Sequence, residues 1–325
     1  MIINVLVSGV GGDVAQGVIK CLGQSDLKFR IYKIAATTQD SWLYLDNDSY
    51  ISPLVSDKNY INYICGFIKK HNIHVFIPCI DSEIEVVSRN KNHIETTTGV
   101  PVAIGDYEKI QICHDKLKTS YFLKEAGLCS PESWPVTDVP PLSHFPLILK
   151  TRSGCGSKNV YDIKTLDDLK SASYDESYML QEKLYGDEYT AGCYIGNDGE
   201  AKGVCILKRQ LKGGSTYYAE RVIDTTLEHY IIAITKTLGL KYLNIQFRLK
   251  NNLPCPFEFN GRFSGTTGII GRVFNAPEMY IRELVLNQHI DKIDSYEKFY
   301  VMRYYEEIYA SEKDISLLLK RGTDD

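Results

Sequence analysis

The sequence lacks the patterns that mark several common classes of protein. Its nine cysteines form no C-x-x-C pair, which argues against zinc and dithiol motifs and indicates reduced, buried thiols. No apolar run is long enough to cross a bilayer, and the first residues, MIINVLVSGVGG, read as a strand without a basic leader. With a net charge of −4, neither nucleic acid nor an anionic membrane is expected as the main partner. We therefore expect a soluble, cytoplasmic protein.

The amino-terminal glycine motif of dinucleotide-binding proteins is also incomplete. In SGVGGDVAQG, Val14 stands where the third glycine of G-x-G-x-x-G would be. The second expected strand ends in IAATT without an acid for a ribose, although Asp40 lies a few residues on. NAD is therefore not expected. Gly11, Gly12 and the helix start at Asp13 are instead candidates to receive an anionic group of a substrate.

The length and the order of expected elements indicate several lobes. The 325 residues, 44% hydrophobic and 24% charged, are enough for a substantial core divided between two or three lobes. No internal repeat is present. In the first unit, residues 1–110, strands alternate with helices, the strands at 3–10, 29–37 and 74–80 and the helices at 14–23 and 57–73. This alternation favours an open parallel α/β sheet.

Two further units follow. Residues 111–185 are expected to form a small α+β lobe with a helix near 112–128 and strands near 145–151 and 178–184. Residues 186–325 are expected to form a larger α+β lobe with strands at 189–196 and 201–210 and a hairpin at 242–263. A helix with the capping-box spacing Thr225–Glu228, ended by Gly239, precedes the hairpin.

The return strand of that hairpin carries an unusual row of polar side chains. In PCPFEFNGRFSG, alternate residues face the same side, so Glu258, Asn260 and Arg262 point together. Phe257 and Phe259 are expected to face the opposite way, into the core. The glycines that follow would allow a ligand or another backbone to approach closely.

The outgoing strand of the hairpin offers a second polar row, which consists of Asn244, Gln246 and Arg248. Both rows could face water, as in a solvated hairpin. We favour a metal site, because carboxylate and amide oxygens are suitable ligands for Mg²⁺. Glu258 could bridge two ions, with Gln246 and Asn260 each binding one. Arg262 would then be an anion clamp beyond the metals.

A lysine at a strand end precedes a loop of small residues. Lys150 ends the apolar strand in LILKTRSGCGSKNV. The loop is not the G-x-x-x-x-G-K-[ST] motif, because the spacing differs and no helix evidently follows. Its backbone N–H groups could still cradle phosphate, with added charge from Lys158. The candidate loop residues are Ser153, Gly154, Gly156 and Ser157.

A third segment, LQEKLYGDEYTAG, suits a nucleoside. Backbone groups from Gln181 to Leu184 could hydrogen-bond a flat base, and Glu188 could accept both hydroxyls of a ribose. An exposed charged turn is the alternative interpretation of this segment taken alone.

Together these segments resemble the ATP-grasp superfamily, and more specifically its carbamoyl-phosphate-synthase-like branch of carboxylate–amine ligases. NIQF…PFEFNGRFSG resembles the branch's pair of metal-binding strands, and HDKLKTSYFLKEAGLCSPES resembles its opening helix. Gly261 replaces the usual proline, and Cys155 stands in the loop where small residues are commoner. The implied fold is α/β, with an open parallel amino-terminal lobe, a small α+β lid lobe and a carboxyl-terminal α+β lobe with an antiparallel sheet.

The resemblance implies a role for each matching residue. Gln246, Glu258 and Asn260 would bind metal, and Arg262 would face the transferred phosphoryl group. Lys116 and Lys150 would contact ATP phosphates. The adenine would be held by Gln181, Glu182 and Leu184, the ribose by Glu188, and the phosphates also by the loop at Ser153, Gly154, Gly156 and Ser157.

The activity implied is ligation of a carboxylate to an amine, which an amino acid could supply. ATP would phosphorylate the carboxylate, and the amine would displace phosphate. Two Mg²⁺ ions, or Mn²⁺ in their place, would assist. Formation of carboxyphosphate or carbamoyl phosphate is an alternative, and a non-catalytic ATP sensor is a second. The sequence does not identify either substrate, and it is compatible with a homodimer.

Residues outside these motifs are further candidates for substrate contact. IPCIDSEIE places Asp81 and Glu83 after the third expected strand, where open α/β sheets bind ligands. They could position an amine, and a loop-capping role is the alternative. Arg209, with Lys208 and Lys212 nearby, could touch phosphate or a substrate carboxylate.

Overall fold

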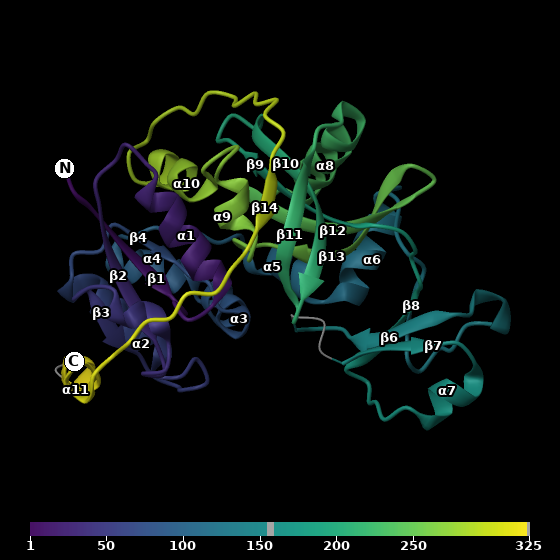
Figure 1. The fold of residues 1–325 in the computed structure, drawn as a ribbon, viewed down its shortest axis with the longest axis horizontal. Helices are drawn as coiled ribbons and strands as arrows, with labels where there is room; N and C mark the ends of the chain where they lie inside the picture. Colours follow the sequence, from purple (N-terminus) through teal and green to yellow (C-terminus); the bar gives the residue numbers. More distant parts are fainter. Residues whose placement is uncertain (155–158, 324–325) are drawn as a thin grey trace.

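The computed structural model describes residues 1–154 and 159–323 (Figure 1). The expected phosphate-loop residues Gly156 and Ser157, together with Cys155 and Lys158, lie outside the described residues. The remaining candidate residues are all described. None of the described helices combines the length and apolarity needed to cross a bilayer.

The amino-terminal lobe is a parallel sheet with strand order β3-β2-β1-β4, as predicted. The strands are β1 (Ile3–Ser8), β2 (Phe29–Ala35), β3 (Ser49–Ile51) and β4 (Val75–Ile77). The helices are α1 (Asp13–Gly23), α2 (Tyr60–Lys70), α3 (Asp81–Arg89) and α4 (Lys91–Thr98), with a short 3-10 helix η1 (Ser41–Tyr44). The short strand β3 and the helices α3 and α4 were not predicted from the sequence.

The small lobe is a separate antiparallel sheet with strand order β5-β8-β6-β7. It comprises β5 (Ser133–Pro135), β6 (Leu147–Thr151), β7 (Val160–Ile163) and β8 (Tyr178–Glu182), with η2 (Leu142–His144) and α7 (Leu166–Ser171). Leu147, Leu149, Ile163, Leu169 and Leu180 form its own core. In Figure 1 this sheet projects from the rest of the molecule.

The carboxyl-terminal lobe is built on an antiparallel sheet with strand order β13-β12-β9-β10-β11-β14. Its strands are β9 (Glu188–Ile195), β10 (Ala201–Lys212), β11 (Ser215–Val222), β12 (Tyr242–Lys250), β13 (Leu253–Asn260) and β14 (Tyr300–Met302). Helix α8 (Thr225–Leu238) packs on one face and ends at the left-handed Gly239, as predicted. Its amino-terminal cap is Asp224, however, whose carboxylate accepts from the backbone N–H groups of Thr226 and Leu227.

Helices α5 (Tyr107–His114) and α6 (Lys116–Glu125) join the lobes. Both pack against β13, and α6 also contacts β5 of the small lobe. Cys113 and Leu123 accordingly belong to the core beneath the large sheet. The helices thus fix Lys116 beside the hairpin, although the domain limits 1–110, 111–185 and 186–325 themselves stay a prediction.

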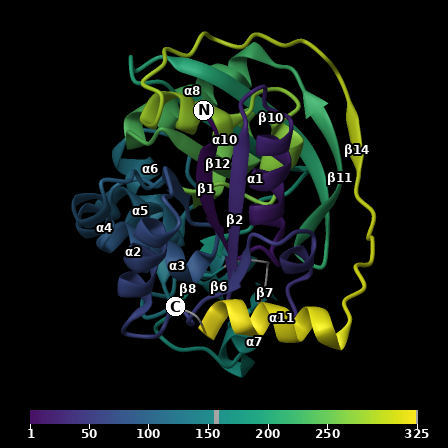
Figure 2. The ribbon, with the colours of Figure 1, turned by 90° about the vertical axis from the view of Figure 1, so that its left-hand side faces the viewer.

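The amino-terminal and carboxyl-terminal lobes share a core. Helix α1 packs on α9 (Thr267–Ile270) and α10 (Ala276–Leu284), and Figure 2 shows α1 beside α10. Helices α1 and α9 approach closely because each has a glycine at the contact. A Cβ on Gly17 of α1 would lie 2.9 Å from the backbone nitrogen of Gly268 in α9. Helix α11 (Glu312–Thr323) packs on β3. The lobe contact fixes the ends of β1 and β4 near the hairpin.

Candidate functional site

The two polar rows of the hairpin lie side by side across the strand pair, as the sequence predicts. Gln246 pairs with Glu258, and Asn244 pairs with Asn260, across β12 and β13. The Gln246 side-chain nitrogen donates to Glu258 Oε1 at 3.1 Å, and the Asn260 side-chain nitrogen lies 3.5 Å from the same oxygen. Asn244 is buried and donates to Thr190 Oγ1 at 2.9 Å. One carboxylate and several amides thus meet at one place.

Phe257 departs from the expected alternation. The pairing register passes from Gln246 and Glu258 directly to Phe247 and Pro256, so Phe257 is an extra residue in the strand. Such a bulge re-aims side chains. Phe257 lines a cavity, and its ring lies 5.5 Å from the Lys150 ammonium. The prediction that Phe257 packs in the core is therefore wrong, whereas Phe259 is buried as expected.

Two cavities meet at the polar row, so the hairpin does not simply face bulk water. The hinge cavity, about 320 Å³, lies between the small sheet and the β12–β13 pair. The interlobe cavity, about 980 Å³, lies between the amino-terminal and carboxyl-terminal lobes. Gly154, Gln246 and Glu258 line both. A ligand in one cavity could therefore reach a ligand in the other at these residues.

The hinge cavity contains most of the residues that the sequence assigns to a nucleotide. They are Lys116, Lys150, Gly154, Gln181, Glu182, Leu184 and Glu188, and the expected metal ligands Gln246 and Glu258 line the same cavity. Gln181 is buried and donates to Ser133 Oγ at 3.0 Å, while Glu182 accepts from Lys250 at 2.6 Å. Ser153 lines the interlobe cavity instead. A volume of this size and composition can accommodate a small polar ligand.

The two lysines are buried close to one another. Lys150 Nζ donates to the Phe257 carbonyl at 3.3 Å, and Lys116 Nζ donates to the Gly154 carbonyl at 2.8 Å. Burial, and then the positive charge of Lys116, lowers the pKa of Lys150 from 10.5 to about 7. A pair of buried ammonium groups beside a cavity favours an anionic ligand.

Glu188 is held by two arginines at the boundary between the cavities. Its Oε1 accepts from Arg209 Nε at 3.1 Å and Nη2 at 2.8 Å. Its Oε2 accepts from Arg248 Nη2 at 3.2 Å. Arg209 lines the interlobe cavity, as expected of a substrate residue, but its guanidinium is bound to Glu188. The sequence pattern gave no sign of this pairing.

Asp81 and Glu83 prove to have different environments, although they are two residues apart. Asp81 lines the interlobe cavity and accepts from Arg262 Nε at 2.7 Å. Glu83 is fully buried and bonds to Ser8 and Tyr60, and burial raises its pKa. Because Glu83 has no exposed surface, the prediction that it contacts a substrate is wrong.

The start of α1 lies beside two acidic residues. Gly12 lines the interlobe cavity, whereas Gly11 does not and packs against the Asp40 carboxylate. Asp13 and Asp40 both line the cavity there. Their negative charges disfavour an anion at this helix start, and the role of Gly11 and Gly12 in binding an anionic group stays a prediction. Both acids stand near this helix start in the sequence, but spacing alone does not show that they line a cavity.

The side chains of the hairpin supply some, but not all, of the oxygen ligands that a hard cation needs. Glu258 supplies carboxylate oxygens, and the amides of Gln246 and Asn260 can turn their oxygens to a cation. Within residues 1–154 and 159–323, no group of three or more His, Cys, Asp and Glu side chains could hold a metal. A cation here would therefore need oxygens from another ligand as well.

An antiparallel hairpin facing a small lid sheet, with a parallel lobe alongside, is the ATP-grasp fold. Residues 113–266 match the family model of the ATP-grasp domain, and residues 8–103 match that of the PylC-like, N-terminal domain. Residues 113–266 thus form an ATP-grasp domain, which agrees with the resemblance seen in the sequence.

Curated relatives match parts of the chain. Carbamoyl-phosphate synthase of Methanobrevibacter smithii is 26% identical over 135 residues, which are 40% of this chain and 37% of that protein. The carbamoyl phosphate synthase large chain of a Thermoanaerobacter species is 27% identical over 203 residues, 55% of this chain and 19% of that protein. The chain thus spans well under half of the length of these relatives.

A solved structure matches nearly the whole chain. N5-carboxyaminoimidazole synthetase from Staphylococcus aureus, complexed with ADP, superposes with a TM-score of 0.70 and 14% identity, covering 98% of this chain and 85% of that chain. At this identity the likeness shows the fold, which agrees with the predicted arrangement of three lobes.

Proposed function

We propose that this protein is an ATP-dependent ligase that joins a carboxylate to an amine, forming a C–N bond and releasing ADP and phosphate. The observation that carries the proposal is the position of Gln246 and Glu258, which line both the hinge cavity and the interlobe cavity. A nucleotide in the first cavity would direct its terminal phosphate toward an acceptor in the second.

The hinge cavity would hold the nucleotide. The segment from Gln181 to Leu184 would contact adenine, Glu188 would accept the ribose hydroxyls, and Lys116 and Lys150 would contact phosphate. Lys116 and Lys150 are both buried and line this cavity, which favours a phosphate ligand because it would stabilise both positive charges. The S. aureus synthetase of the same fold is named as a complex with ADP.

The hairpin would hold divalent cations against the phosphates. Gln246, Glu258 and Asn260 would bind Mg²⁺, or Mn²⁺, with Glu258 shared between two ions. Bound Mg²⁺ would neutralise the phosphate charge and orient the terminal phosphoryl group. Arg262 would add positive charge on the side of the interlobe cavity, since it lines that cavity together with Asn260.

The interlobe cavity would hold the carboxylate and the amine. A carboxylate oxygen would attack the terminal phosphorus, and the bond from that phosphorus to ADP would break. The amine nitrogen would then attack the acyl carbon, phosphate would leave, and the amine would lose a proton. Enclosure between the lobes would limit hydrolysis of the acyl phosphate. An amino acid would supply the amine.

Formation of carboxyphosphate from bicarbonate is the second candidate function. The two curated relatives described above are named as carbamoyl-phosphate synthases, and the chain covers 37% and 19% of their lengths. A non-catalytic ATP sensor is less well supported, because the carboxylate and both amides of the expected metal site are present and adjacent.

Incubation with Mg·ATP and a panel of amino acid and carboxylate pairs tests the proposal. A ligase releases ADP and phosphate only with a suitable pair, and the product contains a new amide bond. ADP release that needs bicarbonate but no amine supports the carboxyphosphate alternative. Tight ATP binding with no turnover for any panel member supports the sensor.

A further inference from the structure

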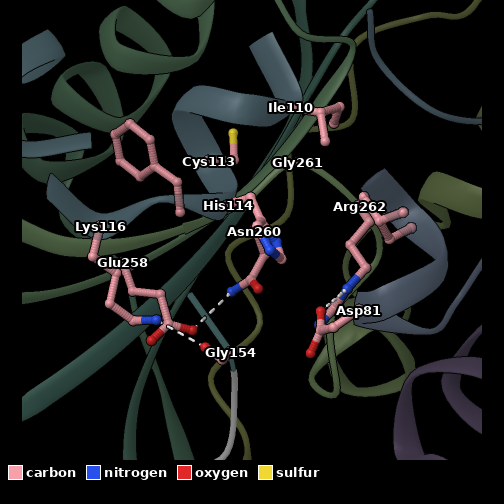
Figure 3. A pocket seen from close by; sticks show the side chains of 12 residues that line it. Asp81, Ile110, Cys113, His114, Lys116, Gly154, Glu258, Asn260, Gly261 and Arg262 are labelled. Carbon is pink, nitrogen blue, oxygen red and sulfur yellow. Dashed lines mark hydrogen bonds and ion pairs between the residues drawn. The ribbon is translucent and has the colours of Figure 1, made fainter. Parts of the chain in front are cut away.

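An ion pair joins the amino-terminal lobe to the arginine of the hairpin. Arg262, just after β13, donates from Nε to Asp81 Oδ1 at 2.7 Å, and its Nη2 also bonds to that oxygen. Its Nη1 donates to the Phe263 carbonyl at 2.6 Å. Figure 3 shows Arg262 and Asp81 together in a small pocket that Glu258 and Asn260 also line, with Asn260 between this pair and Glu258.

The pair is largely shielded from water. The Arg262 side chain is 8% exposed and that of Asp81 is 27% exposed. A buried guanidinium without a carboxylate partner is costly, so Asp81 compensates the charge of Arg262 at this depth. A flexible arginine side chain has many rotamers, and contacts through all three of its nitrogens restrict the guanidinium to one orientation.

Asp81 is itself held in place by Glu83, the residue for which substrate contact was wrongly predicted. Asp81 is the first residue of α3, and Glu83 lies in the same turn. The buried Glu83 carboxylate accepts from Ser8 Oγ at 2.5 Å and from the backbone nitrogens of Cys79 and Ile80 at 3.3 and 3.4 Å. Ser8 ends β1, and Cys79 follows β4. The start of α3 is therefore fixed to the sheet of the amino-terminal lobe.

We propose that Asp81 is a positioning residue, which orients Arg262 for contact with the transferred phosphoryl group. The inference rests on the proposed function, in which Arg262 touches that group. It assigns to the amino-terminal lobe a part in phosphoryl transfer, because Glu83 fixes the first turn of α3 and Asp81 in that turn pairs with Arg262. It also replaces the expectation that Asp81 positions the amine, since its Oδ1 is engaged by the guanidinium.

Binding of Mg·ADP with and without aluminium fluoride tests this role without knowledge of the acceptor. Aluminium fluoride mimics the phosphoryl group in transfer, and such mimics bind more tightly than ground-state ligands. In the unsubstituted chain, fluoride should increase the affinity measured by calorimetry. Asp81→Asn is expected to reduce this gain by about tenfold or more, as for other residues that orient a functional group. Affinity for Mg·ADP alone should stay within about twofold, a separation that general loss of structure would not produce.

Three further variants sharpen the test. Asp81→Glu keeps the charge and should restore part of the gain. Asp81→Asn combined with Arg262→Gln should be no worse than Arg262→Gln alone, because one residue acts through the other. Asp26→Asn is the matched control: Asp26 also pairs with an arginine of the carboxyl-terminal lobe, Arg282, but lines neither cavity, and its removal should leave the gain unchanged.

The outcomes separate the inference from the function beneath it. If aluminium fluoride increases the affinity of Asp81→Asn for Mg·ADP as much as that of the unsubstituted chain, the positioning role alone is overturned. Additive losses in the double variant also overturn it. A wild-type chain that binds Mg·ADP but shows no fluoride-dependent gain also overturns it. A wild-type chain that binds no Mg·ADP contradicts the proposed function as well. If Asp81→Asn fails to fold, Asp81→Glu decides: a reduced gain supports the role, and a full gain overturns it.

Discussion

Gln246 and Glu258 face each other across β12 and β13, with the amide nitrogen 3.1 Å from a carboxylate oxygen. An amide nitrogen does not bind a cation, but a half-turn of the amide presents its oxygen instead. The two residues can then supply oxygens to one cation. They also line both cavities, so this pair is the point on which the proposed chemistry depends.

Glu258→Gln is expected to lower turnover by at least about 10²-fold while the fold is retained, because the variant loses the only carboxylate of the expected metal set. ADP release with the active substrate pair measures turnover, and thermal unfolding measures the fold. Glu200→Gln is a suitable control, since Glu200 is exposed and pairs only at the surface with Lys236. Full activity in Glu258→Gln would refute the metal assignment.

The binding of Mg·ATP should take up a proton above neutral pH. Burial and Lys116 lower the pKa of Lys150 to about 7, so at pH 8 most of Lys150 is neutral before binding. A bound phosphate would raise this pKa, and about one proton would be taken up at pH 8. Affinity should therefore fall as the pH rises through 7. Calorimetry in two buffers of different ionisation enthalpy measures the uptake, which Lys150→Met should abolish; no uptake by the unsubstituted chain would contradict the account.

Glu188→Gln should weaken discrimination between ADP and 2′-deoxy-ADP. If the Glu188 carboxylate accepts the ribose hydroxyls, the loss of its charge removes an interaction of about 1.5–3 kcal/mol. The ratio of the two dissociation constants should then fall toward one. Glu220→Gln, which removes an acid that pairs with Lys208, is the control. An unchanged ratio in Glu188→Gln would show that the ribose is bound elsewhere.

Gly17→Ala should destabilise the protein by about 1–3 kcal/mol, because the new Cβ would lie 2.9 Å from the Gly268 backbone nitrogen and would force α1 away from α9. Gly66→Ala makes the same chemical change in a helix, at a position with no atom within 4 Å. There a gain of up to about 1 kcal/mol is expected. Equal effects of the two substitutions on chemical unfolding would argue against a tight interface between the lobes.

Much of the fold followed from local patterns, whereas contacts between distant segments did not. Alternation in the hairpin predicted that Gln246 and Glu258 share a face, and glycine predicted the end of α8. The bulge at Phe257 breaks that alternation, and the residue types around it do not predict a bulge. Strand β3 has three residues, too few for a periodic pattern.

Burial explains the errors in the site. Asp81 and Glu83 are chemically similar neighbours, yet one lines a cavity and the other is enclosed by Ser8 and Tyr60 from other elements. Likewise, the sequence predicts that Arg209 can bind a ligand, whereas in the structure the pairing of β10 with β9 places Glu188 beside it and the two form an ion pair. Each of these environments is set by tertiary packing, about which sequence spacing carries no information.

Calorimetric titration with ATP, in the presence and absence of Mg²⁺, tests the central claim most directly. The account predicts binding in the presence of Mg²⁺, much weaker binding without it, and loss of this Mg²⁺ dependence in Glu258→Gln. Absence of heat with Mg·ATP, or equal affinity with and without the cation, would contradict a site in which the hairpin of β12 and β13 holds metal against a nucleotide.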